Sequence, residues 1–211
     1  MKITKLGHCC MVIEEGTARI LTDPGAYSDA QNKIKGITHI FITHEHADHY
    51  HLPSLKQVLL NNPAAIIYTN SAVGKLLEAE GISFHQLEQG EQVTVGGVKV
   101  EGVGNEHLAM YRTLPKVMNT GYMFGGRLFY PGDAFTVPKQ TVEILALPVV
   151  GLWATVTQAL DYAIAVKPKK CFPVHDGMLK FLGPYEKIPA TVLPTQGIAY
   201  KVLDLNKSYE F

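Results

Sequence analysis

The stretch His44-Glu45-His46-Ala47-Asp48-His49 constrains this 211-residue chain more than any other part of it. Three histidines and a carboxylate lie directly after the apolar, β-branched run 40–43. At the end of an extended strand, residues 44 and 46 point to the same side, so their imidazoles can share one metal ion. Asp48 and His49 follow after the chain turns and can face a second ion. Imidazole and carboxylate suit Zn, Mn and Fe. The alternative is a polar turn with surface histidines.

A metal site made only from residues 44–49 is incomplete, because zinc usually takes four ligands and a catalytic site keeps one position for water. Three further candidates each follow an apolar predicted strand: His107 follows residues 98–103, Asp133 follows residues 127–130, and His175 follows residues 171–174. Functional side chains of sheet proteins gather at such strand ends. Each residue alone can be a solvated surface group, but the four positions together favour one metal site.

Predicted strands and helices alternate along the chain without a linker-like segment. Helical spacing of apolar residues predicts helices over 52–60, 71–80 and 156–166, and strands are expected to the end of the chain, including 82–86 and 199–205. Glycine pairs at 96–97 and 125–126 predict hairpins, whereas the strand-helix alternation of the first half predicts a partly parallel sheet. We expect a single α/β domain over residues 1–211.

Charge and composition exclude several classes of partner. Nineteen basic and nineteen acidic residues cancel, so nothing favours binding to nucleic acid or to an acidic membrane. No apolar run reaches about 18 residues, and the first residues lack the apolar core of a signal peptide. Three cysteines without a CxxC motif are typical of a reducing compartment. We therefore expect a soluble cytoplasmic protein with a small-molecule substrate.

The order of the candidate ligands resembles that of the metallo-β-lactamase-fold hydrolases. It is His44-x-His46-x-Asp48-His49, then a His, then Gly-Asp, then a final His. The opening Leu6-Gly7-His8-Cys9 and the turn Thr22-Asp23-Pro24-Gly25 are similar to the branch that contains ascorbate-phosphate lactonase-like proteins. The resemblance spans residues 6–175 and implies an αββα four-layer sandwich. It also implies a first metal held by His44, His46 and His107, a second held by Asp48, His49 and His175, and Asp133 bridging both.

Two positions depart from the pattern of that family. Gly132-Asp133 is followed by Ala134 where a threonine or serine hydroxyl is usual, and Tyr50-His51-Leu52-Pro53 replaces the glycines common after the motif. The resemblance also implies that Asp23 lies beneath the metal site and supports it. From the residues alone, Asp23 can equally be a turn-forming aspartate before proline.

This ligand set implies hydrolysis by a hydroxide that bridges two divalent metal ions. Zn is the expected metal, and Mn and Fe are the alternatives. The hydroxide would attack a small ester, lactone or phosphate ester, and Asp48 would bind metal and orient it. His8 and His51 can each be a general acid or a hydrogen-bond partner of a ligand. His39 and His85 lie inside predicted strands and are expected to be structural.

Other functions and contacts stay open from the sequence. A nuclease or phosphodiesterase uses the same motif, although no basic arm for nucleic acid is evident here. A di-iron redox protein also uses it, although no flavin domain is evident. A metal-binding scaffold without activity is the remaining alternative. The segment 108–119 can contact substrate through Tyr111 and Arg112 or form an oligomer contact, so a homo-oligomer is possible. Trp153, the only tryptophan, follows a predicted strand and is expected to line the pocket, with a place in the core as the alternative.

Overall fold

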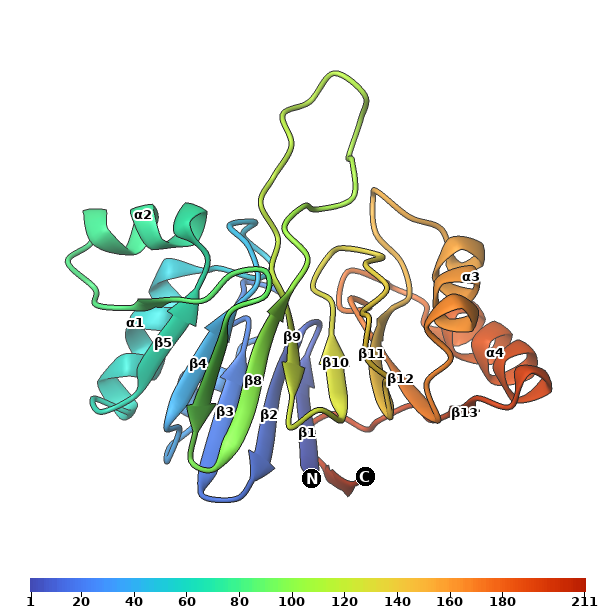
Figure 1. Cartoon of the computed structure of the whole chain (residues 1–211), viewed down its shortest axis with the longest axis horizontal. Helices are drawn as coiled ribbons and strands as arrows, with labels where there is room; N and C mark the ends of the chain where they lie inside the picture. The colour runs from blue at the N-terminus through green and yellow to red at the C-terminus, as the bar shows by residue number, and fades with distance from the viewer.

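Two seven-stranded sheets face each other, and helices cover their outer sides (Figure 1). A computed structural model describes residues 1–211. The first sheet has the order β14 (Ser208–Glu210), β1 (Lys2–Gly7), β2 (Cys10–Glu15), β3 (Ala18–Thr22), β4 (His39–Ile42), β5 (Ile66–Thr69) and β6 (His85–Gln86). The second has the order β13 (Ala199–Tyr200), β12 (Lys170–Val174), β11 (Ile144–Pro148), β10 (Leu128–Tyr130), β9 (Gly121–Phe124), β8 (Val98–Val103) and β7 (Gln92–Val95).

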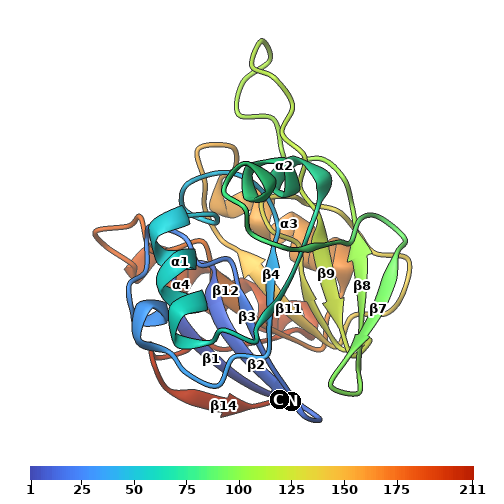
Figure 2. The ribbon, with the colours of Figure 1, turned by 90° about the vertical axis from the view of Figure 1, so that its left-hand side faces the viewer.

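Alternation along the strands divides the buried residues between three apolar layers. In β4, Phe41 enters the core between the two sheets, whereas Ile40 and Ile42 face the helices α1 (Leu52–Asn61) and α2 (Ser71–Ala79). In β11, Ile144 and Ala146 enter the central core, and the intervening residues face α3 (Val156–Val166). A strand period of two can fill two layers only if both faces are covered. The predicted four-layer sandwich is therefore confirmed (Figure 2).

Most of the predicted elements are present. The strands β3 to β6 pair in parallel, and the glycine pairs at 96–97 and 125–126 close the antiparallel pairs β7–β8 and β9–β10. Two predicted strands are shorter in the structure. The strand expected over 82–86 forms only at His85–Gln86, and the one expected over 199–205 ends at Tyr200. The chain leaves the sheet there because Leu203 packs into the central core on the way to β14.

The helix α4 (Gly183–Val192) was not predicted, because Pro189 lies inside it. A proline in a helix lacks the N–H that would bond to the carbonyl four residues earlier. Here that carbonyl belongs to Tyr185, and it accepts a hydrogen bond of 3.2 Å from the hydroxyl of Tyr200. The hydrogen bond from Tyr200 thus replaces the one that Pro189 cannot make, and the helix continues through the proline.

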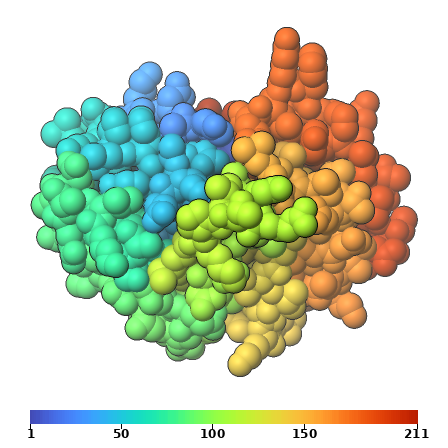
Figure 3. Space-filling view, turned by 90° about the horizontal axis from the view of Figure 1, so that it is seen from above, coloured from blue at the N-terminus to red at the C-terminus, as the bar shows by residue number.

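One edge of the sandwich carries the ends of the strands that precede the candidate ligands. The chain leaves β4, β8, β10 and β12 at this edge, and the turn between β1 and β2 lies there too (Figure 1). The segment 104–120, which joins β8 to β9, projects from the same edge and stands over its centre in Figure 3. No helix of the structure is both long enough and apolar enough to cross a membrane.

Candidate metal centre

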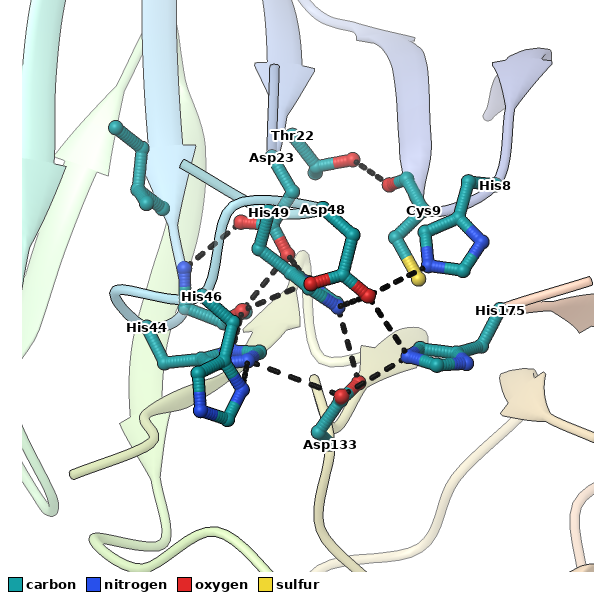
Figure 4. A network of polar contacts seen from close by, with 12 residues as sticks. His8, Cys9, Thr22, Asp23, His44, His46, Asp48, His49, Asp133 and His175 are labelled. Atoms are coloured by element: carbon teal, nitrogen blue, oxygen red, sulfur yellow. Dashed lines mark hydrogen bonds and ion pairs between the residues drawn. The ribbon is translucent and has the colours of Figure 1, made fainter. Parts of the chain in front are cut away.

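All seven predicted ligands lie together at this edge, in two groups, and the ligand atoms of each group lie within 4.8 Å of one another. Figure 4 labels six of the seven, all except His107. One group contains His44, His46, His107 and Asp133. The other contains Asp48, His49 and His175, joined by His8. Elements from both sheets therefore contribute to each side of one site.

Asp133 lies between the two groups. Its Oδ2 atom is 2.9 Å from His175 Nε2 and 3.3 Å from His107 Nε2, and its Oδ1 atom is 3.2 Å from His49 Nε2. The side chain is almost fully buried. The two oxygens of this carboxylate therefore have imidazoles of both groups around them.

The backbone before Asp133 fixes this position. Gly132 has a φ of 64°, and a Cβ there would lie 2.3 Å from Asn119 Oδ1. Asn119 in turn accepts a hydrogen bond from the Asp133 N–H at 3.0 Å and donates one to the Pro131 carbonyl at 2.8 Å. Only glycine fits both the left-handed backbone and the close approach, which explains the Gly-Asp pair.

Trp153 contacts Asp133 from a different loop. Its indole N–H donates a hydrogen bond of 3.0 Å to Asp133 Oδ2. The ring also packs edge-on against His107 and His175, with centroid distances of 5.7 and 5.3 Å. The sequence did not reveal this contact, because Trp153 comes from the loop after β11 and has no motif around it.

Asp23 lies beneath the histidines and supports them, as the resemblance implied. The side chain is fully buried, and its oxygens accept hydrogen bonds from the backbone N–H and hydroxyl of Thr43 at 2.8 and 2.7 Å and from the Tyr130 hydroxyl. His49 Nδ1 lies 2.7 Å from the same carboxylate. Because the Nδ1–H of His49 donates to Asp23, its Nε2 is left free to face the site.

The loop that carries Asp48 and His49 rests on the turn that follows Asp23. A Cβ on Gly25 would lie 1.7 Å from the Asp48 carbonyl oxygen, so the two backbones are in direct contact. The Ala26 N–H donates to the Ala47 carbonyl at 2.8 Å. The turn therefore sets the height of the histidine loop above β3.

His8 reaches the site from the β1–β2 turn with a φ of 44°. Its Nδ1 accepts a hydrogen bond of 3.1 Å from the Gly177 N–H, and its Nε2 lies 3.2 Å from Asp48 Oδ2. A neutral imidazole that accepts at Nδ1 carries its proton on Nε2, so His8 donates to Asp48. Burial lowers the pKa of His8, with a smaller opposing effect of Asp48, which favours this neutral form.

The remaining histidines lie apart from the ligand groups. His51 is the N-cap residue of α1, and its Nδ1 lies 2.9 Å from the Ser54 hydroxyl. His39 and His85 pack against the two sides of the Tyr68 ring, with centroid distances of 6.2 and 5.4 Å. These contacts fit the structural roles that the sequence suggested for His39 and His85.

Cys9 lies near the site and was not recognised from the sequence, although it directly follows His8. Its sulfur is within 4.8 Å of ligand atoms of His49 and Asp133. Burial, followed by the nearby carboxylates, raises the thiol pKa well above its ordinary value. In the metal-free protein the sulfur therefore stays protonated.

The two groups differ in protonation when they hold no metal. Burial and neighbouring histidines hold the pKa of His44 well below its ordinary value. Burial also lowers the pKa of His175, but the Asp133 and Asp48 carboxylates outweigh it and raise that pKa to about 9. For His49, the carboxylates of Asp133 and Asp23 outweigh burial and raise the pKa well above its usual range. His44 is thus neutral, whereas His49 and His175 form ion pairs with the carboxylates beside them.

Several buried atoms of the site fit metal binding. Nε2 of His49, His107 and His175 and Oδ1 of Asp133 have no hydrogen-bond partner in the protein. Buried polar atoms are otherwise almost always satisfied, so such a set calls for an explanation. Imidazole nitrogens and carboxylate oxygens that approach one another without hydrogen bonds are the donor set that a divalent transition metal requires.

A family model described as a β-lactamase superfamily domain matches residues 2–175 of the chain. The chain belongs to this superfamily. A protein of Mycobacterium tuberculosis is 33% identical over 184 residues, which cover 85% of each chain. A UPF0173 metal-dependent hydrolase of Alkaliphilus metalliredigens is 26% identical over 83% of this chain and 85% of that one. Igni18, a metallo hydrolase of Ignicoccus hospitalis, shares the fold with a TM-score of 0.76 at 19% identity, over 100% of this chain and 98% of that one.

Loops of this superfamily member enclose a cleft of about 230 Å³ above the ligands. Trp153 lines the cleft, as predicted. Tyr111 and Arg112 do not line it, whereas Met110 from the same segment does. The Arg112 guanidinium instead lies 5.9 Å from the centre of the exposed Tyr111 ring. The prediction that these two residues contact an anionic group therefore has no support in the geometry, because the segment points them outward.

Proposed function

We propose that this protein is a hydrolase that uses two divalent metal ions, most simply Zn with Mn or Fe as alternatives, to cleave a small ester, lactone or phosphate ester. The observation that carries the proposal is the convergence of two ligand groups on the single buried carboxylate of Asp133. The relatives named metal-dependent hydrolases support it. The balanced charge of the chain favours a small-molecule substrate over nucleic acid.

His44, His46 and His107 would hold one ion, Asp48, His49 and His175 the other, and Asp133 both. When bound, a pair of divalent cations supplies water of lowered pKa and polarises the group that is attacked. Asp48 lines the cleft and is half-buried, so its carboxylate can orient water at the cleft floor. Asp23 accepts a hydrogen bond from His49 Nδ1 and holds that imidazole in place. Trp153 donates a hydrogen bond to Asp133 Oδ2 and holds that carboxylate in place.

His8 is better placed as a positioning residue than as the general acid that we considered from the sequence. It lies behind Asp48, is 2% exposed and does not line the cleft. Its Nε2–H donates to Asp48 Oδ2, while Gly177 holds the opposite nitrogen. A proton leaving His8 would have to pass through the Asp48 carboxylate. We therefore propose that His8 fixes the orientation of Asp48.

The proposal is tested by metal analysis of the purified protein together with turnover of acetate esters, lactones and phosphodiesters. We expect close to two Zn or Mn ions per chain, loss of hydrolysis with a chelator and recovery when metal is returned. His107→Ala should lower turnover by at least about 10²-fold, because one group loses a ligand. His85→Ala removes an exposed histidine far from the ligands and is the matched control.

Three results would count against the proposal. Full turnover by a metal-loaded Asp133→Ala variant would rule out a bridging role for this carboxylate. Iron with reversible redox changes and no hydrolysis would favour a di-iron redox protein. Salt-dependent cleavage of RNA without turnover of small esters would favour a nuclease.

A further inference from the structure

The walls of the cleft are apolar, in contrast to its floor. Nine residues line it, and four of them are candidate ligands: His46, Asp48, Asp133 and His175. The other five are Tyr27, Met110, Leu152, Trp153 and Met178. No lysine, arginine, serine, threonine, asparagine or glutamine is among the lining residues. Above the metal ligands, the cleft therefore offers almost no hydrogen bonds and no fixed positive charge.

These wall residues come from four separate loops, yet they share an apolar character and are open to solvent. Leu152 is 79% exposed, Tyr27 is 50% exposed and Met178 is 37% exposed. Phe181, in the same loop as Met178, is 73% exposed. Clusters of exposed apolar side chains on a protein surface usually mark a binding site. Because this cluster continues directly into the candidate metal centre, its natural occupant is the part of a substrate next to the reacting bond.

We propose that the substrate carries a short apolar acyl chain or a single aromatic ring beside the scissile ester or lactone bond. This inference rests on the proposed function. A sugar phosphate would place its hydroxyls against Leu152, Met110 and Met178, whose side chains offer no hydrogen-bond partners. Polar groups that lose water without gaining a partner weaken binding. The cleft volume of about 230 Å³ lies below that of sites for drug-sized ligands, so the apolar group is small.

The inference predicts a chain-length series. With metal-loaded protein, kcat/KM for methyl acetate, methyl butyrate and methyl hexanoate, followed by acid release, should rise about two- to fourfold for each methylene until the chain leaves the cleft. Leu152→Ala and Met178→Ala should flatten this rise, because they remove apolar surface that the longer chains contact. Leu60→Ala removes a side chain that is 74% exposed on α1 and does not line the cleft, and it is the control.

A second readout does not require turnover. Trp153 is the only tryptophan and lines the cleft, so its fluorescence reports occupation of the cleft in the metal-loaded or the metal-free protein. Hexanoate should shift the emission of Trp153 to the blue at a lower concentration than acetate does. Leu152→Ala should weaken the binding of hexanoate several-fold. Glucose 6-phosphate should change the emission only at much higher concentration.

The outcomes separate the two proposals. If acetate ester is hydrolysed but kcat/KM does not rise with chain length, or if glucose 6-phosphate binds more tightly than hexanoate, the apolar substrate is wrong and the hydrolase stands. If no ester, lactone or phosphate ester is cleaved although hexanoate binds at Trp153, the proposed function is wrong and the apolar site stands. If Trp153 emission instead follows protein concentration and a dimer covers the cleft, the apolar walls are an interface between copies, and the inference is overturned.

Discussion

The floor and the walls of the cleft are built in different ways. The floor side chains are mostly buried and lie at the ends of strands, and each is fixed by neighbours from other elements, as Asp23 fixes His49 and Asn119 fixes the backbone of Asp133. The wall side chains stand on loops and are largely exposed. His175 in the floor, and His8 and Asp23 behind and beneath it, even keep left-handed backbones that favour glycine. Such strain persists only where the surroundings over-determine the conformation.

This difference indicates that the floor determines metal binding and the walls determine the choice of substrate. The floor side chains are held in place by many buried contacts, so we expect changes there to appear in metal affinity and in stability. The walls can be changed without disturbing that arrangement, so their effects should appear in the preference among substrates. Four predictions test this division, in order of decreasing expected effect.

The largest effect is expected at Lys5, which supports the floor from below. It is 2% exposed, and its Nζ donates to both oxygens of Asp176 at 2.7 and 2.6 Å and to the Pro173 carbonyl at 2.9 Å. Lys5→Met leaves the Asp176 carboxylate buried and unpaired beside His175, which should lower the free energy of unfolding by about 3–5 kcal/mol. Urea unfolding of the two proteins measures it.

The matched control for Lys5 is Lys56, whose ion pair with Glu80 is exposed. Lys56→Met should leave the unfolding midpoint nearly unchanged, since exposed ion pairs contribute little. Adding Asp176→Leu to Lys5→Met should restore much of the lost stability. Equal midpoints for the Lys5 and Lys56 variants would show that the clamp under the floor has no special role.

The next effect is the pH dependence of metal binding. Zinc must displace the proton from His175, whose pKa near 9 lies above the ordinary 6.5. His49, whose pKa also lies well above its usual range, must lose a proton too. Affinity should therefore rise by at least about tenfold per pH unit from pH 7 to 9, or at least about 2.7 kcal/mol in all. Stability of the metal-free protein should change in the opposite direction. The stabilisation from His175 is complete below pH 6.5 and is lost as the pH rises through about 9.

Calorimetric titration with Zn in buffers of different ionisation enthalpy counts the protons released at each pH. Hexanoate binding to the walls of the metal-free protein, followed by Trp153 fluorescence, serves as the comparison and should change much less over the same range. A Zn affinity that is flat from pH 7 to 9 would mean that His175 is already neutral in the metal-free protein.

The same division explains what the sequence could predict. The floor comes from short, chemically specific patterns at strand ends, and His44, Asp133 and His175 were found in this way. The alternation of β4 and β11 likewise encodes two buried faces. The Trp153–Asp133 hydrogen bond and the acceptance of Pro189 in α4 depend on contacts between distant loops and strands, and no local pattern predicts such contacts. The outward direction of Tyr111 depends on loop conformation for the same reason.

The third effect is expected at Asp23, which touches no substrate. Asp23→Asn removes the charge that holds the Nδ1–H of His49, so Zn affinity should fall about 10–100-fold. A chelator competition titration measures this change, and the fold should be kept, as judged by circular dichroism. Asp29→Asn changes an exposed aspartate on the following loop and is the control. Equal affinities for the two variants would mean that Asp23 only forms the turn before Pro24.

The smallest effect is expected at Trp153, the one wall residue that also contacts the floor. Trp153→Phe keeps an aromatic wall but removes the N–H that donates to Asp133, so Zn affinity should fall only about fivefold, since one hydrogen bond at a partly exposed site is lost. The rise of kcat/KM with acyl-chain length should be unchanged. Gly151→Ala should alter both properties, because a Cβ at residue 151 would lie 2.5 Å from the indole ring and displace it. If Trp153→Phe abolished the chain-length preference and left Zn affinity intact, the indole would belong to the wall alone, and the support of Asp133 would have to come from Asn119 and the backbone of Gly132.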